Sequence, residues 1–335
     1  MKFFIALLVT CILLSCQLKS VSNENRPSKS NYELVSTWPE LSVNFKIGQP
    51  TGIGIDRDEH IFVFHRAGRK WTTPFPDTVI SQNTVLELES ESGKIIRSWG
   101  ANYFIMPHGL TVDHQNNVWL TDVGLHQIFK FSHEGSLLMK LGVAKVPGND
   151  SSHFNLPTDI AIADDGSFYV SDGYGNSRVV KFSSAGKYIK SWGSYGDMPG
   201  QFRIPHGIAI DKNNTIYVAD RQNNRIQLFD SSGHFIKELK NDMIVEQLPS
   251  IAIDRPDHLF AIDYDPTIKM DSTVKGSTIF EFDSSQHGHN HFGATGSVER
   301  STCWFHDIAV DSKGNMYVGD ILGLKVLKFK PNKSL

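Results

Sequence analysis

The sequence has little cysteine, since only three of its 335 residues are cysteines. Two of these, Cys11 and Cys16, lie in the apolar N-terminal segment, so the remainder of the chain keeps only Cys303. An intramolecular disulfide is therefore excluded there, and stability must come from packing. An excess of one charge is also lacking, because 33 basic residues face 36 acidic ones. This balance argues against nucleic-acid binding and against a basic membrane-binding stripe.

The N-terminus has the pattern of a targeting segment. Lys2 precedes an apolar run over residues 3–14, which has the length of a signal-peptide core and is short for a membrane span. The run ends in the letters LLSC at Cys16. This ending resembles the bacterial lipoprotein signal, in which the cysteine carries lipid after cleavage. A plain secretory signal or a short membrane anchor is the alternative interpretation.

Three segments follow from this interpretation. We expect residues 1–16 to be a lipoprotein signal peptide with a lipidated Cys16, and residues 17–31 to be a flexible tether, because they are polar and lack periodicity. Residues 32–335 would form the folded domain. The protein is then predicted to be exported and anchored on the periplasmic or cell-surface side of a bacterial membrane, with the lipid as its sole membrane contact.

A pattern of short strands recurs six times along the chain. LPTDIAIADDGSFYVSDGYGNSRVVKF (156–182) matches IPHGIAIDKNNTIYVADRQNNRIQLF (204–229) in frame. Each copy alternates apolar and polar residues between Asp, Asn and Gly turns, which predicts four antiparallel strands per copy. The copies start at Pro50, Pro107, Pro157, Pro205, Pro249 and Phe305.

Such copies cannot bury their faces alone, so we expect them to stack around an axis as an all-β, six-bladed β-propeller. The copies resemble NHL repeats. The sixth copy runs out after its third strand, near residue 330, and residues 32–38 resemble a fourth strand. We therefore expect the N-terminal strand to pair with the last blade and close the ring, which removes exposed strand edges. The closed domain is expected to be a monomer.

One face of the predicted disc carries the long connections. The turns between first and second strands are short, whereas the insertions all fall at the other ends of the strands. Long loops on a rigid scaffold are where binding and catalytic sites are built. The insertions span residues 67–83, 143–155, 265–276 and 293–304.

Three histidines occupy equivalent places at the start of the first strand in alternate blades. They are His108, His206 and His306, spaced by about 100 residues. Alternate blades of a six-bladed ring lie about 120° apart, so the imidazoles should converge on the axis. Three neutral histidines with a free fourth position are typical of catalytic zinc. A single such histidine would more simply be a turn residue.

The ends of the second strands add polar groups to the same face. Arg66, Tyr174 and Arg221 lie there, and Tyr174 stands between two glycines that would let its ring point inward. Such a tyrosine, close to a cation and a metal, could act as a base. Packing and surface roles are the alternatives. We interpret five recurring aspartates as turn-capping residues, namely Asp122, Asp172, Asp220, Asp263 and Asp320.

The runs PHGLTVD, VSDGYGNSRVVKF, PHGIAI, VADRQNNRIQLF and FHDIAV resemble the peptidyl-α-hydroxyglycine α-amidating lyases, from about Trp38 to Phe329. The resemblance implies cleavage of the C–N bond of a small-molecule or peptide substrate with an α-hydroxyglycine end, giving an amide and glyoxylate. It places the catalytic zinc on the three histidines. It also implies a catalytic Tyr174 and active-site arginines at Arg66 and Arg221. A structural calcium ion would take Asp307 and the carbonyls of Ile53 and Leu110.

The chain departs from the family pattern in three ways. Two disulfides of animal members fall at Asn155 with Gly175 and at Tyr217 with Leu228. Trp304 replaces a methionine near the zinc, and we expect it to form part of the substrate wall. No copper monooxygenase domain is present, so another enzyme is expected to supply the hydroxylated substrate.

Two other functions remain open from the sequence. Many NHL propellers bind partners without catalysis, and a fold alone does not decide function. A lactonase-like hydrolase is the second, although such sites usually hold calcium through Asp, Asn and Glu around the axis. The run HGHNH at 287–291 could also bind metal, but a solvated strand edge is the simpler interpretation.

Overall fold

The computed structural model describes residues 31–240, 247–254, 258–264, 276–282, 288–293 and 303–332, without the side chains of 288–290. The predicted signal peptide, the lipidated Cys16 and the tether up to residue 30 lie outside these residues. Within the described part, no helical segment has the length and apolar character that crossing a membrane needs.

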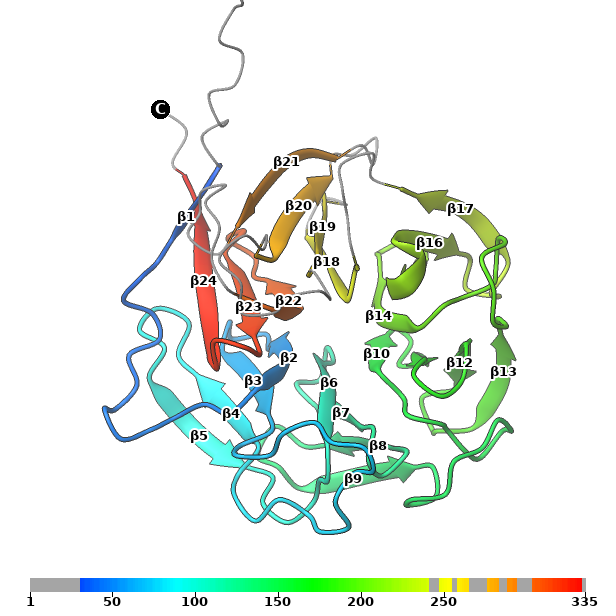
Figure 1. The fold of residues 1–335 in the computed structure, drawn as a ribbon, viewed down its shortest axis with the longest axis horizontal. Helices are drawn as coiled ribbons and strands as arrows, with labels where there is room; N and C mark the ends of the chain where they lie inside the picture. The colour runs from blue at the N-terminus through cyan, green and yellow to red at the C-terminus, as the bar shows by residue number, and fades with distance from the viewer. Residues whose placement is uncertain are drawn as a thin grey trace, which may run out of the picture.

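Six four-stranded antiparallel sheets surround one axis (Figure 1), which confirms the predicted six-bladed propeller. The first three blades contain β2 (Pro50–Ile55), β3 (Ile61–His65), β4 (Val85–Leu88), β5 (Ile95–Trp99), β6 (Pro107–Val112), β7 (Val118–Asp122), β8 (Gln127–Phe131), β9 (Leu137–Leu141), β10 (Asp159–Ile162), β11 (Phe168–Asp172), β12 (Arg178–Phe182) and β13 (Tyr188–Trp192). The other three contain β14 (Pro205–Ile210), β15 (Ile216–Asp220), η1 (Arg221–Asn223), β16 (Arg225–Phe229), β17 (Phe235–Leu239), β18 (Ser250–Asp254), β19 (His258–Ile262), β20 (Thr278–Phe282), β21 (Gly288–Gly293), β22 (Phe305–Val310), β23 (Met316–Asp320) and β24 (Lys325–Pro331).

The depth of each strand in its blade explains its composition. Second strands such as β7 and β15 are buried along their whole length, because neighbouring blades cover both of their faces. Fourth strands such as β9 and β17 lie at the outer rim and are largely exposed. The apolar core therefore fills the spaces between blades, where burial of apolar surface stabilises the ring.

The N-terminal strand closes the ring as predicted. β1 (Tyr32–Leu34) pairs antiparallel with β24, and Tyr32 lies opposite Pro331. The Tyr32 ring stacks on Phe292, with centroids 5.3 Å apart. The last blade is thus completed by β1, so the two ends of the described chain close the ring by strand pairing.

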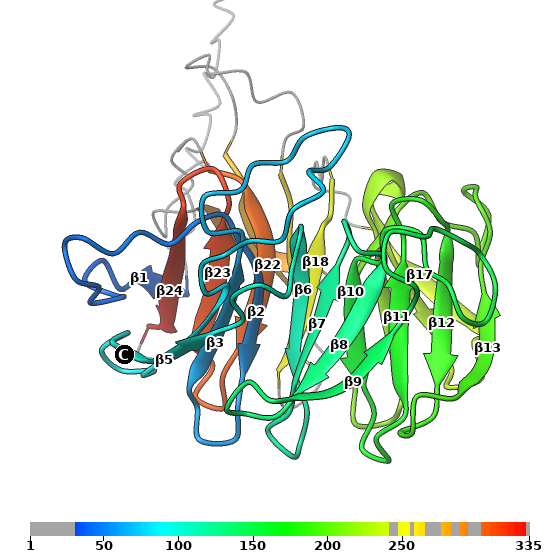
Figure 2. The same ribbon diagram turned by 90° about the horizontal axis from the view of Figure 1, so that it is seen from below.

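The two faces of the disc differ in the length of their connections (Figure 2). The 67–83 connection joins β3 to β4 and lies over the upper face in that view, whereas short turns line the lower face. Residues 143–155 join β9 to β10. Most of the other two predicted insertions lies outside the described residues.

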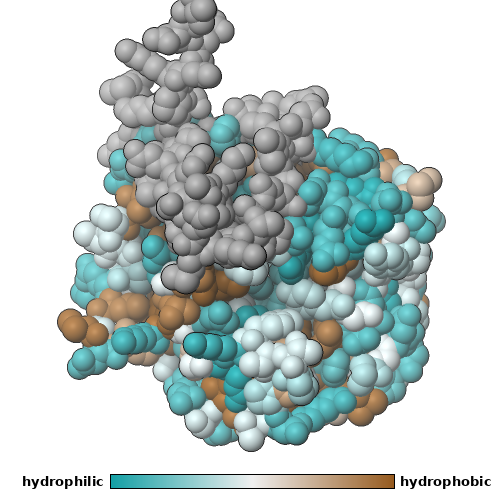
Figure 3. Space-filling view, in the orientation of Figure 1, coloured by the Kyte–Doolittle hydropathy of each residue, from teal (hydrophilic) through white to brown (hydrophobic). Residues whose placement is uncertain are grey.

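The recurring aspartates cap turns, as predicted. Asp122 accepts hydrogen bonds from the backbone nitrogens of Ile105, Met106 and Leu125, each at 2.8 Å. Asp263 Oδ1 accepts one from Thr278 N at 2.6 Å. These side chains hold the connections around the polar face, since backbone N–H groups at turns need acceptors. On the described surface, seen along the axis in Figure 3, apolar residues form separated patches among polar ones.

Candidate active site

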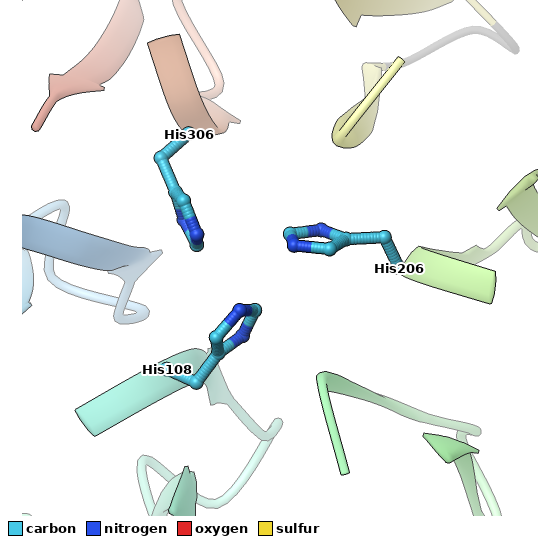
Figure 4. A group of neighbouring side chains, drawn as sticks. All are labelled: His108, His206 and His306. Carbon is cyan, nitrogen blue, oxygen red and sulfur yellow. The ribbon is translucent and has the colours of Figure 1, made fainter. Parts of the chain in front are cut away.

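Three histidines meet on the axis, as their spacing predicts. His108 lies in β6, His206 in β14 and His306 in β22, and their rings point toward a common centre (Figure 4). One nitrogen from each lies within 4.8 Å of those of the other two. All three side chains are buried. The arrangement can hold one ion between three blades.

The other nitrogen of each ring is held by the neighbouring odd-numbered blade. Each Nδ1 lies within hydrogen-bond distance of a backbone carbonyl, and a carbonyl can only accept, so Nδ1 carries the proton. The pairs are His108 with Thr158 O at 2.7 Å, His206 with Pro249 O at 2.8 Å, and His306 with Thr51 O at 2.8 Å. The Nε2 lone pairs are thereby directed to the axis, as in proteins whose outer contacts orient metal-binding histidines.

The three histidines His108, His206 and His306, which we call the triad, are electrically neutral at pH 7. Burial lowers the pKa of His306 to about 3, with a further contribution from Arg66. Burial also holds the pKa of His108 and His206 well below the usual range, and nearby histidines and arginines add to this effect. Neutral imidazole is the form that binds metal, so no proton has to be displaced. Three neutral nitrogen donors with room for a further ligand fit zinc.

Tyr174 completes the site. Its hydroxyl lies 3.1 Å from His108 Nε2 and 3.0 Å from His206 Nε2. The predicted need for flanking glycines is correct, but its reason is space. A Cβ at Gly173 would lie 1.9 Å from Pro205 O, and one at Gly175 would lie 2.2 Å from the side chain of Asn155.

Arg221 contacts Tyr174 from the next blade. Its Nη1 donates a hydrogen bond to the Tyr174 hydroxyl at 3.0 Å, and its Nη2 donates to the hydroxyl of Tyr264. Its Nε donates to Gln247 Oε1 at 3.0 Å, which fixes the plane of the guanidinium. Trp304 stacks on Tyr264, with ring centroids 4.5 Å apart. A cation and an aromatic wall therefore adjoin the tyrosine.

Arg66 approaches from the first blade. Its Nε donates to Pro107 O at 3.1 Å, and its Nη1 donates to Gln49 Oε1 at 3.0 Å. The guanidinium lies 5.1 Å from the ring centre of Trp71. Burial lowers the pKa of Arg66 to about 10, so the group remains a cation at pH 7. Its charge reaches the triad, since it lowers the pKa of His306.

Two carboxyl groups, the buried Asp307 and the half-buried Asp159, lie in the channel beyond the triad. Asp307 accepts hydrogen bonds from Ile53 N at 2.7 Å and from Ser250 Oγ at 2.6 Å. Burial raises the pKa of Asp307 to about 7, and burial together with the charge of Asp307 raises the pKa of Asp159. Both line a cavity of about 280 Å³ with Ile53 and Leu110. A cation would relieve such a pair, and the carbonyl roles of Ile53 and Leu110 stay predictions.

Sequence reasoning missed Tyr264, Gln247 and Trp71. A signal for Tyr264 existed, because it follows Asp263 as Arg221 follows Asp220 in the preceding blade. Trp71 lies in the 67–83 connection, where it contacts Tyr174 with centroids 5.3 Å apart. No periodicity marks a residue in such a loop, so its place could not be predicted.

The two disulfide positions implied by the family resemblance are neighbours in space. Tyr217 and Leu228 are cross-strand partners in β15 and β16. Gly175 N donates a hydrogen bond to Asn155 O at 3.0 Å. Non-covalent contacts therefore occupy both places, and the one described cysteine, Cys303, is buried and forms no disulfide.

Comparisons with known proteins agree with this architecture. A family model described as a 6-bladed beta-propeller matches residues 138–265, and one described as an NHL repeat matches residues 104–131. Peptidyl-glycine alpha-amidating monooxygenase B of Xenopus laevis is 36% identical over 315 residues, covering 89% of this chain and 35% of the relative. Peptidyl-alpha-hydroxyglycine alpha-amidating lyase 1 of Drosophila melanogaster is 37% identical over 256 residues, covering 70% of this chain and 47% of the relative. The chain thus spans about a third to a half of these relatives.

Solved structures match the fold at low identity. A gluconolactonase of Xanthomonas campestris has a TM-score of 0.60 at 13% identity, covering 86% of this chain and 87% of that one. Virginiamycin B lyase of Staphylococcus aureus has a TM-score of 0.54 at 14% identity, covering 85% of this chain and 97% of that one. These likenesses show the propeller fold alone, because one fold hosts many activities.

Proposed function

Because the chain belongs to the NHL-repeat β-propellers of the peptidyl-α-hydroxyglycine α-amidating lyase family, we propose that it is a zinc-dependent lyase acting on an α-hydroxyglycine substrate. It would cleave the C–N bond of N–CH(OH)–COO⁻ to give an amide and glyoxylate. One observation carries the proposal. Three neutral, converging imidazoles lie beside a tyrosine hydroxyl that an arginine contacts at 3.0 Å.

The histidines present the donor set that zinc requires. Their Nδ1 protons are used by backbone carbonyls, so the Nε2 atoms of His108, His206 and His306 would hold the ion. When bound, zinc supplies Lewis acidity that favours ionisation of the substrate hydroxyl. Nε2 atoms that bind a metal would no longer accept hydrogen bonds from the Tyr174 hydroxyl. Its hydroxyl is then available to the substrate.

The remaining residues divide the proton transfer and the binding between them. Tyr174 would remove the proton of the substrate hydroxyl as general base, with Arg221 Nη1 donating a hydrogen bond to its oxygen at 3.0 Å. As the C–O bond becomes the aldehyde C=O of glyoxylate, the C–N electron pair would stay on nitrogen, which would take the proton from Tyr174 to become the amide N–H. Arg221 and Arg66 supply cations for the substrate carboxylate. Trp304 would form one wall.

We expect the purified protein to release glyoxylate from an α-hydroxyglycine compound and to stop doing so after zinc is removed by a chelator. Added zinc should restore the activity, because the triad is preformed by its backbone hydrogen bonds. Glyoxylate formation is the readout. A fully zinc-loaded protein that releases no glyoxylate would rule out the lyase and favour the binding-module interpretation.

We also propose a structural calcium ion held by Asp307 with the carbonyls of Ile53 and Leu110. Support comes from the buried Asp307 and the half-buried Asp159, which share the channel cavity. Calcium is expected to raise the midpoint of thermal unfolding by several degrees, because it binds the folded state alone. Asp307→Asn should abolish that response, whereas the exposed Asp164→Asn should keep it. An equal calcium response in all three proteins would contradict the assignment.

A further inference from the structure

A second group of metal-binding side chains lies at the border of the first two blades. Asp56 follows β2, His60 precedes β3, Glu87 lies in β4, and His133 follows β8. One ligand atom from each lies within 4.8 Å of the others. The turn between β2 and β3 of blade one and the turn between β8 and β9 of blade two meet there, on the face opposite the connections that surround the triad. We call Asp56, His60, Glu87 and His133 the rim cluster.

The other blades differ at the same register: blade four has Leu228 across from Tyr217, and blade five, like blade one, has a glutamate, Glu281, across from Phe260. In the remaining three, a lysine lies across from a second-strand aromatic residue. These pairs are Trp119 with Lys130, Tyr169 with Lys181, and Tyr317 with Lys328, with each ammonium 4.8–5.5 Å from the ring centre. In blade one, the residue across from Phe62 is Glu87. In blade one, the buried Glu87 carboxylate thus takes the place of a lysine, next to Asp56, which follows the first strand.

A histidine also replaces the polar residue of the adjoining turn. In blades two and six, an asparagine follows the turn aspartate by four positions, as Asn117 follows Asp113 and Asn315 follows Asp311. In blade one that position is His60, and in blade five it is His258, four positions after Asp254. The backbone of the turn is unchanged, since Asp56 Oδ1 accepts from His60 N at 2.8 Å as Asp113 Oδ1 accepts from Asn117 N at 2.9 Å. The two substitutions therefore change the ligands and keep the scaffold.

The separations between the ligand atoms suit a small tetrahedral ion. Asp56 Oδ2 lies 2.8 Å from His133 Nε2 and 3.2 Å from His60 Nδ1. Glu87 Oε1 lies 3.4 Å from His60 Nδ1 and 3.7 Å from His133 Nε2. Bonds of about 2.0–2.2 Å to a tetrahedral zinc ion place neighbouring ligand atoms about 3.3–3.6 Å apart. The four separations bracket that range.

Both carboxylates are buried, and one oxygen of Glu87 has no hydrogen-bond partner. The Glu87 side chain is 1% exposed, and its Oε2 has no hydrogen-bond partner, with Arg97 Nε 3.6 Å away. The His60 and His133 side chains are 30% and 20% exposed, so the cluster opens to solvent at one edge. A buried carboxylate with an oxygen that accepts no hydrogen bond is costly, and a divalent cation is one means of compensating its charge. The open edge gives an ion a way in.

We propose that the rim cluster is a second site for a divalent transition metal of the zinc class, which joins blade one to blade two. Two imidazole nitrogens and two carboxylate oxygens are donors that such ions accept. Asp56, His60 and Glu87 come from blade one and His133 from blade two. The ion would therefore cross-link adjacent blades, and no disulfide does so among the described residues. The site is independent of the triad and of the proposed lyase activity.

The double variant His60→Asn with Glu87→Lys tests the site, because it recreates the residues that blades two and six carry at these positions. After chelation, reloading with zinc and dialysis, the unaltered protein should hold one more zinc ion per chain than this variant. Lyase activity should be the same in both, since neither residue contacts the triad. Equal zinc contents in the two proteins would overturn the proposal.

A thermal measurement separates the rim cluster from the triad. In the His206→Ala protein, zinc at a hundredfold excess over its dissociation constant should raise the unfolding midpoint by about 5 °C. Adding the His60→Asn and Glu87→Lys changes to that protein should abolish this rise. If the four side chains form only an ion-paired cluster of protonated histidines and carboxylates, the midpoint will not respond to zinc in either protein. Zinc counting in the unaltered background remains decisive should His206→Ala fail to fold.

Discussion

Replacing Tyr174 by phenylalanine is expected to lower the turnover number for glyoxylate release by a factor of about 10²–10⁴, the usual contribution of a positioned general base. The ring would keep its place, because its backbone is fitted against Pro205 and Asn155. Zinc should stay bound, since the Nδ1 contacts that orient the triad do not involve Tyr174. Steady-state kinetics and zinc content, measured on the same preparation, check both parts.

Tyr264→Phe is the matched control for that experiment. Tyr264 and Tyr174 both accept a hydrogen bond from Arg221, but only the Tyr174 hydroxyl lies near the histidine nitrogens. Loss of the Tyr264 hydroxyl should mainly raise KM, because it loosens an arginine assigned to the substrate carboxylate. Wild-type turnover in the Tyr174→Phe protein would remove the tyrosine from the mechanism. An equal loss in both variants would show that the hydroxyls merely position Arg221.

The architecture could be predicted because a propeller repeats itself. The first strand of each blade begins with a similar run of residues, so the position of one copy locates the others. β1 was recognisable because its sequence resembles that of a fourth strand. The same symmetry predicted the triad. Residues at equivalent places in alternate blades must approach the axis together, and His108, His206 and His306 do so.

What the repeat does not contain could not be predicted. Trp71 reaches Tyr174 from a connection without periodicity. Tyr264 and Gln247 matter because they accept hydrogen bonds from the Arg221 guanidinium, and a contact between two blades cannot be seen in the sequence. The rim cluster is a related case, since His133 joins Asp56 only across a blade border. Its clue was a departure from the repeat, a glutamate at the register where three blades have lysine.

Replacing His206 by alanine is expected to remove zinc from the triad and to lower kcat/KM by at least about 10³. A Lewis acid contributes several kcal/mol to the stabilisation of developing negative charge, and two histidines do not hold the ion as three do. The surface change His114→Ala is the control, because the His114 side chain is exposed and pairs with Asp164, outside the triad. Zinc analysis and glyoxylate kinetics give the readout. Activity within tenfold of the unaltered protein, without stoichiometric zinc, would contradict the metal mechanism.

Acid unfolding of the metal-free protein tests whether the triad is buried in its neutral form. Because the pKa of His206 lies well below its usual value in the fold and that of His306 is about 3, the unfolded chain binds more protons below about pH 6.5. The free energy of unfolding should then fall as pH drops from about 6.5 toward 3, by up to about 1.4 kcal/mol per histidine and pH unit. His206→Ala removes one such histidine, so its metal-free form should lose stability less steeply than the unaltered protein. Parallel slopes would mean that His206 is solvated or protonated in the folded protein, and the preformed zinc site would fail with it.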